Sequence, residues 1–194
     1  MGANEQWRVD RYSQGLVRKS RLLNADLRLA ACDGDIKKVE NLLERGADIN
    51  APGVQGDSAL TSVESCMQHD KLLQSRVPLI ELLMAKGAEV NHQDADGTTA
   101  LMYAAENGDT QAVNALLRNG ASVNLVDKDG ETALMKAAAS SCTEETVMAL
   151  INSGADLDAR DHKGRNALDS FLASYACPES KVGDLLKMET QKSK

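Results

Sequence analysis

Short apolar runs recur along the chain, and a glycine follows each of them closely. Valine, leucine and isoleucine at helical spacing form such runs at 39–43, 113–117 and 147–151. A Gly-Ala pair begins at each of positions 46, 87, 120 and 154, which are 41, 33 and 34 residues apart. Because glycine adopts the left-handed conformation that ends a helix without a steric penalty, each run predicts a helix that stops at its glycine.

A second phrase recurs in the same register. A glycine is followed three and four residues later by Ala-Leu at 56–60, 97–101, 130–134 and 164–168, again at spacings of 41, 33 and 34 residues. Ser58, Thr99 and Thr132 stand directly before Ala-Leu pairs and are typical N-caps, so a second helix is predicted to begin there. The repeating unit is therefore a polar turn, a short helix, a second turn and a longer helix.

This unit resembles the ankyrin repeat, which consists of about 33 residues that form a β-turn and two helices. The stretch from Asp94 to Asn124 is similar to the family pattern from end to end, and 127–158 repeats it with one extra residue near Ser140. Where the family usually has Pro and His, this stretch has Ala100 and Met102. The resemblance implies an all-α fold, an ankyrin-repeat solenoid of about five stacked helix-turn-helix units with short β-hairpin loops.

The shared register also divides the chain. We expect an ankyrin-repeat domain over 24–189, preceded by an N-terminal basic segment or capping helix at 1–23 and followed by a C-terminal tail at 190–194. The units are approximately 24–52, 53–93, 94–126, 127–160 and 161–189. The second unit holds eight extra residues between Ala59 and Ile80, enough to lengthen each of its helices by about one turn. These extra residues are either a surface insertion or a contact for a partner.

Composition and charge narrow the classes of function. Aromatic residues make up only 3% of the chain, which argues against platforms that stack nucleic-acid bases. The net charge is −7, and an acidic protein is repelled by phosphate backbones and anionic lipid. Residues 1–23 are the exception, with five basic and two acidic residues. We therefore expect neither nucleic acid nor a membrane as a partner.

The cysteines bear on the compartment. Cys32, Cys66, Cys142 and Cys177 lie far apart and form no C-x-x-C motif. The chain opens with no apolar signal segment and contains no run of eighteen apolar residues. We expect a cytoplasmic protein, or one that also enters the nucleus by diffusion, with its thiols reduced and mostly buried.

Motifs that carry chemistry do not occur in the sequence. The three histidines fall in different units without a second ligand at metal-binding spacing, and Asp94 to Gly97 places its glycine too early for a calcium loop. Nucleophile-elbow, P-loop and dinucleotide-binding glycine patterns are absent. We therefore expect no enzyme activity, no cofactor, and no catalytic, cofactor-binding or metal-ligating residues.

The family resemblance implies that protein partners bind the concave face formed by the hairpins and the first helices. The predicted function is a non-catalytic protein–protein interaction module, an adaptor or scaffold, which we expect to be monomeric. A regulatory subunit or inhibitor of an enzyme, or a host-directed effector built on ankyrin repeats, remains an alternative. The candidate partner-binding residues are Asp57, Asp96, Thr98, Met102, Glu106, Asn107, Lys128, Asp129, Glu131, Met135, Lys163 and Arg165.

The acidic members of this set lead to one specific hypothesis. Asp96, Asp129 and Glu131 fall on adjacent predicted hairpins, so a partner segment with basic residues is expected to fit there. The alternative interpretation is that these carboxylates only stabilise the turns that carry them.

Overall fold

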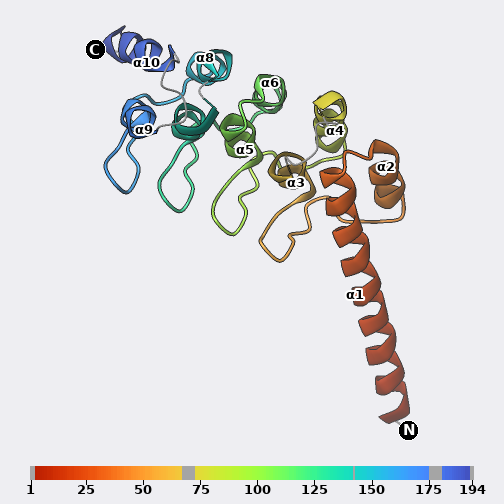
Figure 1. Cartoon of the computed structure of the whole chain (residues 1–194). Helices are drawn as coiled ribbons and strands as arrows, with labels where there is room; N and C mark the ends of the chain where they lie inside the picture. The colour runs from red at the N-terminus through yellow and green to blue at the C-terminus, as the bar shows by residue number, and fades with distance from the viewer. Residues whose placement is uncertain (1–2, 67–72, 142, 175–180, 193–194) are drawn as a thin grey trace.

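The computed structural model describes residues 3–66, 73–141, 143–174 and 181–192, with side chains described from residue 17 onward apart from those of 73–75. Its helices lie in two rows, and loops extend beyond one of the rows (Figure 1). The inner row contains the C-terminal part of α1 (Ala3–Cys32), α3 (Ala59–Ser65), α5 (Ala100–Glu106), α7 (Ala133–Lys136) with the π-helix η2 (Ala137–Ser141), and α9 (Ala167–Ala173). The outer row contains α2 (Ile36–Glu44), α4 (Leu73–Ala85), α6 (Thr110–Arg118), α8 (Glu144–Asn152) and α10 (Val182–Lys192). This architecture confirms the predicted all-α solenoid.

Four loops extend from the inner row and are called the fingers below. They comprise residues 51–58, 92–99, 125–132 and 159–166, and each ends where an inner helix begins. Within the described residues the only bridge of β type joins Val126 to Thr132. The fingers are therefore turns held by individual hydrogen bonds rather than β-ladders of any length.

Hydroxyl caps start the inner helices, as the sequence predicts. The side-chain oxygens of Ser58, Thr99 and Thr132 accept hydrogen bonds from the backbone N–H three residues on. Asn166 does the same for α9. Each cap satisfies a backbone donor that the first helical turn cannot satisfy itself, and a cap of this kind contributes about 1 kcal/mol.

Glycines in the left-handed conformation end the outer helices, again as predicted. Gly46, Gly87, Gly120 and Gly154 have φ angles between 85° and 91°. In each case the N–H of the following alanine donates to the carbonyl five residues before it, for example Ala121 to Leu116 at 3.0 Å. This is the Schellman pattern, in which the glycine satisfies helix-terminal carbonyls that otherwise have no partner.

The core is built from small and aliphatic side chains at repeating positions. Leu60, Leu101 and Leu134 occupy equivalent places in successive inner helices and are almost fully buried, and Leu116 and Leu150 do so in the outer row. Alanines between the rows, such as Ala104 and Ala137, are also buried and let the helices approach closely. The aromatic-poor composition is thus a consequence of the two-layer packing.

The two predicted length anomalies are accommodated in different ways. The extra residue near Ser140 is absorbed by the five-residue π-helix η2, which continues α7. In the second unit, α4 has 13 residues whereas α6 has nine, but α3 and α5 both have seven. The expected lengthening by one turn is therefore found in the outer helix alone, and residues 67–72 lie outside the described part.

Asparagine side chains connect the loop that follows each outer helix to the same loop of the next unit. Asn50, Asn91 and Asn124 each accept a hydrogen bond from a backbone N–H of the following unit and donate one to its Gly-Ala glycine. Asn124 Oδ1 accepts the N–H of Asp156 at 2.8 Å, and Asn124 Nδ2 donates to the carbonyl of Gly154 at 3.0 Å. Asp158 occupies the same register position in the last unit.

Helix α1 is longer than a repeat helix. It begins at Ala3 and runs without a break to Cys32, so the boundary expected near residue 23 falls inside one helix. Its buried residues, among them Leu23, Leu27 and Ala30, face α2 and α3, whereas its N-terminal half extends away from the array (Figure 1). The side chains of Trp7 and Tyr12 lie outside the described set.

One disulfide corrects the expectation of reduced thiols. Cys32, the last residue of α1, is bonded to Cys66, which follows the end of α3. Their Cα atoms are 5.4 Å apart, within the normal range for a disulfide. Both residues are half-buried rather than buried in the core. Neither the cysteine spacing nor the absence of an apolar opening segment indicates this pair, because stacking brings the ends of two consecutive inner helices together.

Candidate functional site

Each finger after the first is built on one buried or half-buried aspartate. The Oδ1 atom of Asp94 accepts hydrogen bonds from the N–H groups of Asp96 and Thr98, both at 2.9 Å. Asp127 and Asp161 bind the equivalent N–H groups of their own fingers in the same way. The first residue of each of these turns, Asp94, Asp127 or Asp161, is therefore structural.

The second oxygen of each aspartate binds a donor that differs from unit to unit. Asp94 Oδ2 accepts the hydroxyl hydrogen of Tyr103 at 2.7 Å, and Asp127 Oδ2 lies 2.8 Å from Lys136 Nζ. Burial and the hydrogen bond to Asp94 raise the pKa of the Tyr103 hydroxyl, so it remains a donor at neutral pH. The sequence alone did not predict these contacts of the turn aspartates, although Tyr103 and Lys136 stand at equivalent positions of their units.

The fingers are also joined to one another through their backbones. The N–H of Ala95 donates to the carbonyl of Gln55 at 2.8 Å, that of Lys128 to Asp96 at 2.9 Å, and that of His162 to Asp129 at 2.9 Å. His92 adds a side-chain bond, because its Nε2 lies 2.7 Å from the Gly56 carbonyl. Neighbouring fingertips therefore hold a fixed spacing, which presents their exposed side chains as one continuous surface.

The first finger differs because Gly53 takes the place of the turn aspartate. A Cβ at this glycine would overlap the carboxylate of Asp57 and the guanidinium of Arg28. Asp57 instead forms an ion pair with Arg28 of α1, at 3.0 Å, and Arg28 also donates to the Ala51 carbonyl. This pair docks α1 onto the first finger, so the Asp57 carboxylate is already engaged.

The finger face, formed by the four fingers and the ends of the inner helices beside them, contains most of the predicted partner-binding residues. The exposed ones are Asp96, Glu106, Lys128, Asp129 and Lys163, and the half-buried ones are Asp57, Asn107, Glu131 and Arg165. Thr98 is buried within its finger. Met102 and Met135 are only 1% exposed and belong to the core, so they do not form part of this face. Their position directly after the Ala-Leu pair places them between units rather than on the surface.

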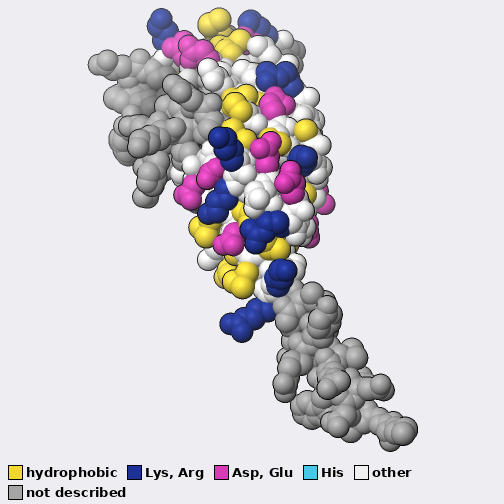
Figure 2. All heavy atoms as spheres, turned by 90° about the vertical axis from the view of Figure 1, so that its right-hand side faces the viewer, with side chains coloured by type: hydrophobic (Ala, Val, Ile, Leu, Met, Phe, Trp, Pro, Cys, Tyr) yellow, Lys and Arg dark blue, Asp and Glu magenta, His cyan; other side chains and the backbone are white. Residues whose placement is uncertain are grey.

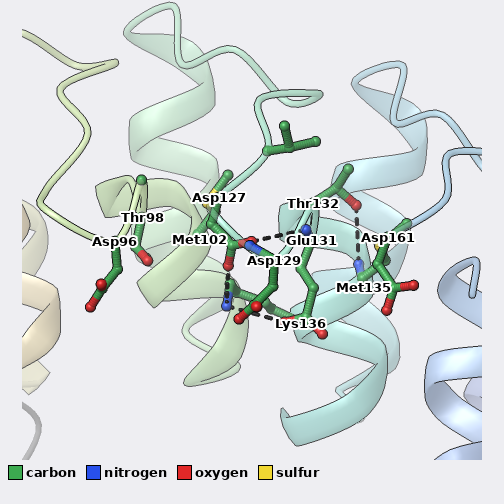
Figure 3. A network of polar contacts seen from close by, with 12 residues as sticks. Asp96, Thr98, Met102, Asp127, Asp129, Glu131, Thr132, Met135, Lys136 and Asp161 are labelled. Atoms are coloured by element: carbon green, nitrogen blue, oxygen red, sulfur yellow. Dashed lines mark hydrogen bonds and ion pairs between the residues drawn. The ribbon is translucent and has the colours of Figure 1, made fainter. Parts of the chain in front are cut away.

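One of the charged candidates, Glu131, belongs to a network of ion pairs around Lys136 (Figure 3). Lys136 lies between Asp127 and Glu131, at 2.8 and 3.4 Å, and Glu131 also lies 3.2 Å from Arg165. Burial of the Lys136 ammonium acts to lower its pKa, but the hydrogen bond to Asp127 and the nearby carboxylates outweigh burial and raise the pKa. Lys136 is therefore a fixed positive charge among these acids.

Three other carboxylates of the finger face make no contact of this kind. Asp96, Glu106 and Asp129 are exposed, and their carboxylates make no hydrogen bond or ion pair with another described residue. In Figure 3, Asp96 lies apart from the network around Lys136. The acidic part of the finger face is therefore narrower than the sequence predicts, and Glu131 is not part of it.

A buried charged cluster lies at the junction of the second and third units. Glu64 of α3 is 0% exposed, and neither of its carboxylate oxygens has a hydrogen-bond partner among the described residues. Its Oε1 lies 3.9 Å from Nε of Arg76, whose guanidinium also contacts Asp109 at the start of α6. Burial raises the pKa of the Glu64 carboxyl to about 8, although the charge of Arg76 opposes this shift.

The sequence does contain a signal for this cluster. Glu64 stands where the next unit has the buried Ala105, so a carboxyl group has replaced a methyl group inside the stack. The cluster joins three helices, which suits a structural junction better than a binding surface because its residues are inaccessible.

Figure 2 shows the side of the molecule that lies to the right in Figure 1. Basic and acidic side chains of the described residues are interspersed over it, with hydrophobic ones between them. Surfaces of this mixed kind are typical of the solvated side of a soluble domain. On the described residues, no group of three or more His, Cys, Asp or Glu side chains is placed to hold a metal ion.

Comparison with known proteins agrees with this architecture. A family model for ankyrin repeats matches three times, over residues 27–127, 72–161 and 108–180, and these matches cover more than half of the chain. The chain therefore belongs to the ankyrin repeat family, whose arrays are protein-binding modules and are typically non-catalytic.

Two relatives share part of the chain. The first, the RelA-associated inhibitor of Mus musculus, is 32% identical over 101 residues, which are 52% of this chain and 11% of the relative. The second, the ankyrin repeat protein YahD of Escherichia coli strain K12, is 33% identical over 87 residues, which are 45% of this chain and 39% of the relative. The chain thus spans well under half the length of either relative. Among the described helices, none has the length and apolar composition of a membrane-spanning segment.

Proposed function

We propose that this chain is a non-catalytic adaptor that binds a segment of a partner protein on its finger face. The observation that carries the proposal is the set of three exposed carboxylates, Asp96, Glu106 and Asp129, that no turn, cap or ion pair uses. Their neighbours Asp127 and Glu131 are engaged by Lys136. An exposed charge without a structural role on a rigid surface is suited to recognise a partner.

The chemistry of the three carboxylates favours a segment that carries lysine or arginine. Charge complementarity at an exposed surface mainly raises the rate of encounter and the specificity, and it weakens with added salt. The hydrogen bonds between fingers keep Asp96 and Asp129 in a fixed relation, so little ordering is needed when a partner binds. The basic residues of the last finger, such as Lys163, give the same face an opposite charge at its C-terminal end.

The test replaces the free carboxylates and leaves the structural ones intact. The double variant Asp96→Lys/Asp129→Lys is compared with Glu40→Lys/Glu44→Lys, which makes the same change in net charge on the exposed side of α2. A partner is first identified by affinity purification and mass spectrometry, and its binding to purified chain is then measured by calorimetry. We expect the dissociation constant to rise at least tenfold for the finger-face variant and to stay within twofold for the control. Equal binding by both variants would refute the role of these carboxylates.

A second candidate function is the regulation of an enzyme by the bound chain. It is favoured by the similarity to a protein named as an inhibitor, the RelA-associated inhibitor. An adaptor and an inhibitor use the same surface, so they differ only in what binding does to the partner. If the identified partner is an enzyme, its turnover is measured with and without a saturating amount of the chain. A change in turnover supports the regulatory role, and unchanged turnover supports the adaptor.

A further inference from the structure

The residue that ends an inner helix connects back to the preceding unit at several junctions. Asn107 Nδ2 donates to the carbonyl of Glu64 at 2.9 Å, and the hydroxyl of Ser174 donates to the carbonyl of Ala139. At the first junction the corresponding residue is Cys66, and its connection to the preceding helix is the disulfide to Cys32. A covalent bond therefore stands where two other junctions have a hydrogen bond.

The disulfide lies at the ends of two helices rather than inside the packed core. Cys32 is in the last turn of α1 and Cys66 directly follows α3, and both are half-buried. Neither belongs to the buried hydrophobic core, which is continuous through the stack without them. A half-buried disulfide outside the core is easier to reach than one enclosed in it, and accessible disulfides are the more labile ones.

The stability of the array does not require a covalent staple. A chain of this length buries enough apolar surface to fold without one, and small disulfide-dependent domains are usually much shorter. Where a disulfide occurs in a reducing compartment it is usually transient and redox-sensing. A bond that opens and closes reconciles this structure with the sequence-based expectation of reduced thiols.

We propose that Cys32 and Cys66 form a reversible thiol–disulfide switch that fixes the first helix pair, α1 and α2, to the rest of the array. In the oxidised state the bond joins the ends of α1 and α3. In the reduced state the first pair is held by its packing and by the ion pair between Arg28 and Asp57. Reduction is therefore expected to increase local opening of the N-terminal unit and to leave the middle units unchanged.

The chemistry in both directions is a balanced two-electron exchange. For reduction, one thiolate of a dithiol attacks Sγ of Cys32 or Cys66, and the second thiol of the reagent resolves the mixed disulfide. The chain gains two electrons and two protons, and the dithiol becomes a cyclic disulfide. For oxidation, a cysteine thiolate attacks one oxygen of hydrogen peroxide, which breaks the O–O bond, forms a sulfenic acid and releases hydroxide. The sulfenic acid then condenses with the second thiol, which forms the disulfide and releases water.

The experiment uses the full chain carrying Cys142→Ser and Cys177→Ser, so that only the proposed pair can titrate. One sample is oxidised with hydrogen peroxide and the other is reduced with dithiothreitol, and alkylation followed by mass spectrometry counts the free thiols. Hydrogen–deuterium exchange is then measured for backbone amides in 23–47 and in 100–118. We expect two thiols to appear on reduction, at least tenfold faster exchange in 23–47, and no change in 100–118. Reoxidation should restore the slow exchange.

Two controls make the outcome decisive. A variant in which Cys32 and Cys66 are also serine should exchange like the reduced sample and should not respond to peroxide. The oxidised sample is also incubated with reduced glutathione at the excess found in cytoplasm. Opening of the pair there supports a switch, whereas a pair that stays closed is a permanent staple and overturns the proposal. Equal exchange in the oxidised and reduced samples would overturn it as well.

Discussion

Replacing Glu64 with glutamine is expected to change how the stability of the array depends on pH. The folded-state pKa of this carboxyl is raised from 4.5 to about 8, chiefly by burial. The folded state therefore binds the proton more tightly than the unfolded state does. The stability that depends on protonated Glu64 is fully present below about pH 4.5 and is lost as the pH rises toward about 8.

The size of the effect follows from the same shift. The value pH 7 lies about 2.5 units above the unfolded-state pKa of 4.5, and each unit is equivalent to about 1.36 kcal/mol. Between pH 4.5 and 7 the wild-type chain is thus expected to lose on the order of 3 kcal/mol from this one group. Glutamine has nearly the same shape but does not titrate, so Glu64→Gln removes this loss.

The assay compares the unfolding free energies of the two proteins across this range. Urea unfolding followed by far-UV circular dichroism is run at several values between pH 4.5 and 8, with the disulfide kept oxidised in every sample. Titrations shared by both proteins cancel in the difference, which should increase steadily with pH in favour of the variant. Glu106→Gln is the matched control, since Glu106 is exposed at the end of the next inner helix, and it should show no such trend.

The opposite result is a Glu64→Gln variant that is less stable than the wild-type chain. If Glu64 is ionised at pH 7 as the partner of Arg76, the variant leaves the guanidinium without that charge. Breaking a buried ion pair in this way costs about 3–5 kcal/mol. A variant that is less stable than wild type by this amount at pH 7 would refute the assignment of a neutral carboxyl at this junction.

Two further substitutions test the connections between units. Asn124→Ala removes hydrogen bonds to Asp156 and Gly154 and should lower the unfolding free energy by about 1–3 kcal/mol. Asp158→Ala, at the equivalent position of the next unit, should change the unfolding free energy by less than about 0.5 kcal/mol. Urea unfolding of both variants measures the difference, and equal losses would contradict the role of Asn124. Gly97→Ala should lower the melting temperature more than Gly46→Ala does. Both glycines have positive φ, but only at Gly97 would a Cβ press against the next finger, 3.1 Å from Asp127 Cα. Equal shifts of the melting temperature in calorimetry would show that the contact between fingers is easily relaxed.

The fold could be predicted from the sequence because its local signals repeat. The cap at Thr99, the glycine at 87 and the buried alanines all recur in one shared register, so each copy supports the interpretation of the others. Even the π-helix in the fourth unit was visible as one extra residue against this register. Local conformational preferences and a constant repeat length are sufficient for predictions of this kind.

The candidate site was predictable only in part, because side-chain partners depend on distances across units. The register places Asp96 and Glu131 near one another, but it does not show that Lys136 and Arg165 neutralise Glu131. The disulfide is a similar case. Its cysteines are 34 residues apart, close to one repeat, yet their pairing depends on how the ends of α1 and α3 meet in space.

The π-helix also indicates where this array can change in length during evolution. Its extra residue, like the eight extra residues of the second unit, lies in the interval that joins an inner helix to its outer helix. The backbone bonds between fingers are present on both sides of each insertion. Insertions at the helix joins are thus absorbed by a single unit, whereas one in a finger would shift bonds to both neighbours. New sequence can therefore accumulate at one edge of the molecule while the opposite edge keeps its pattern.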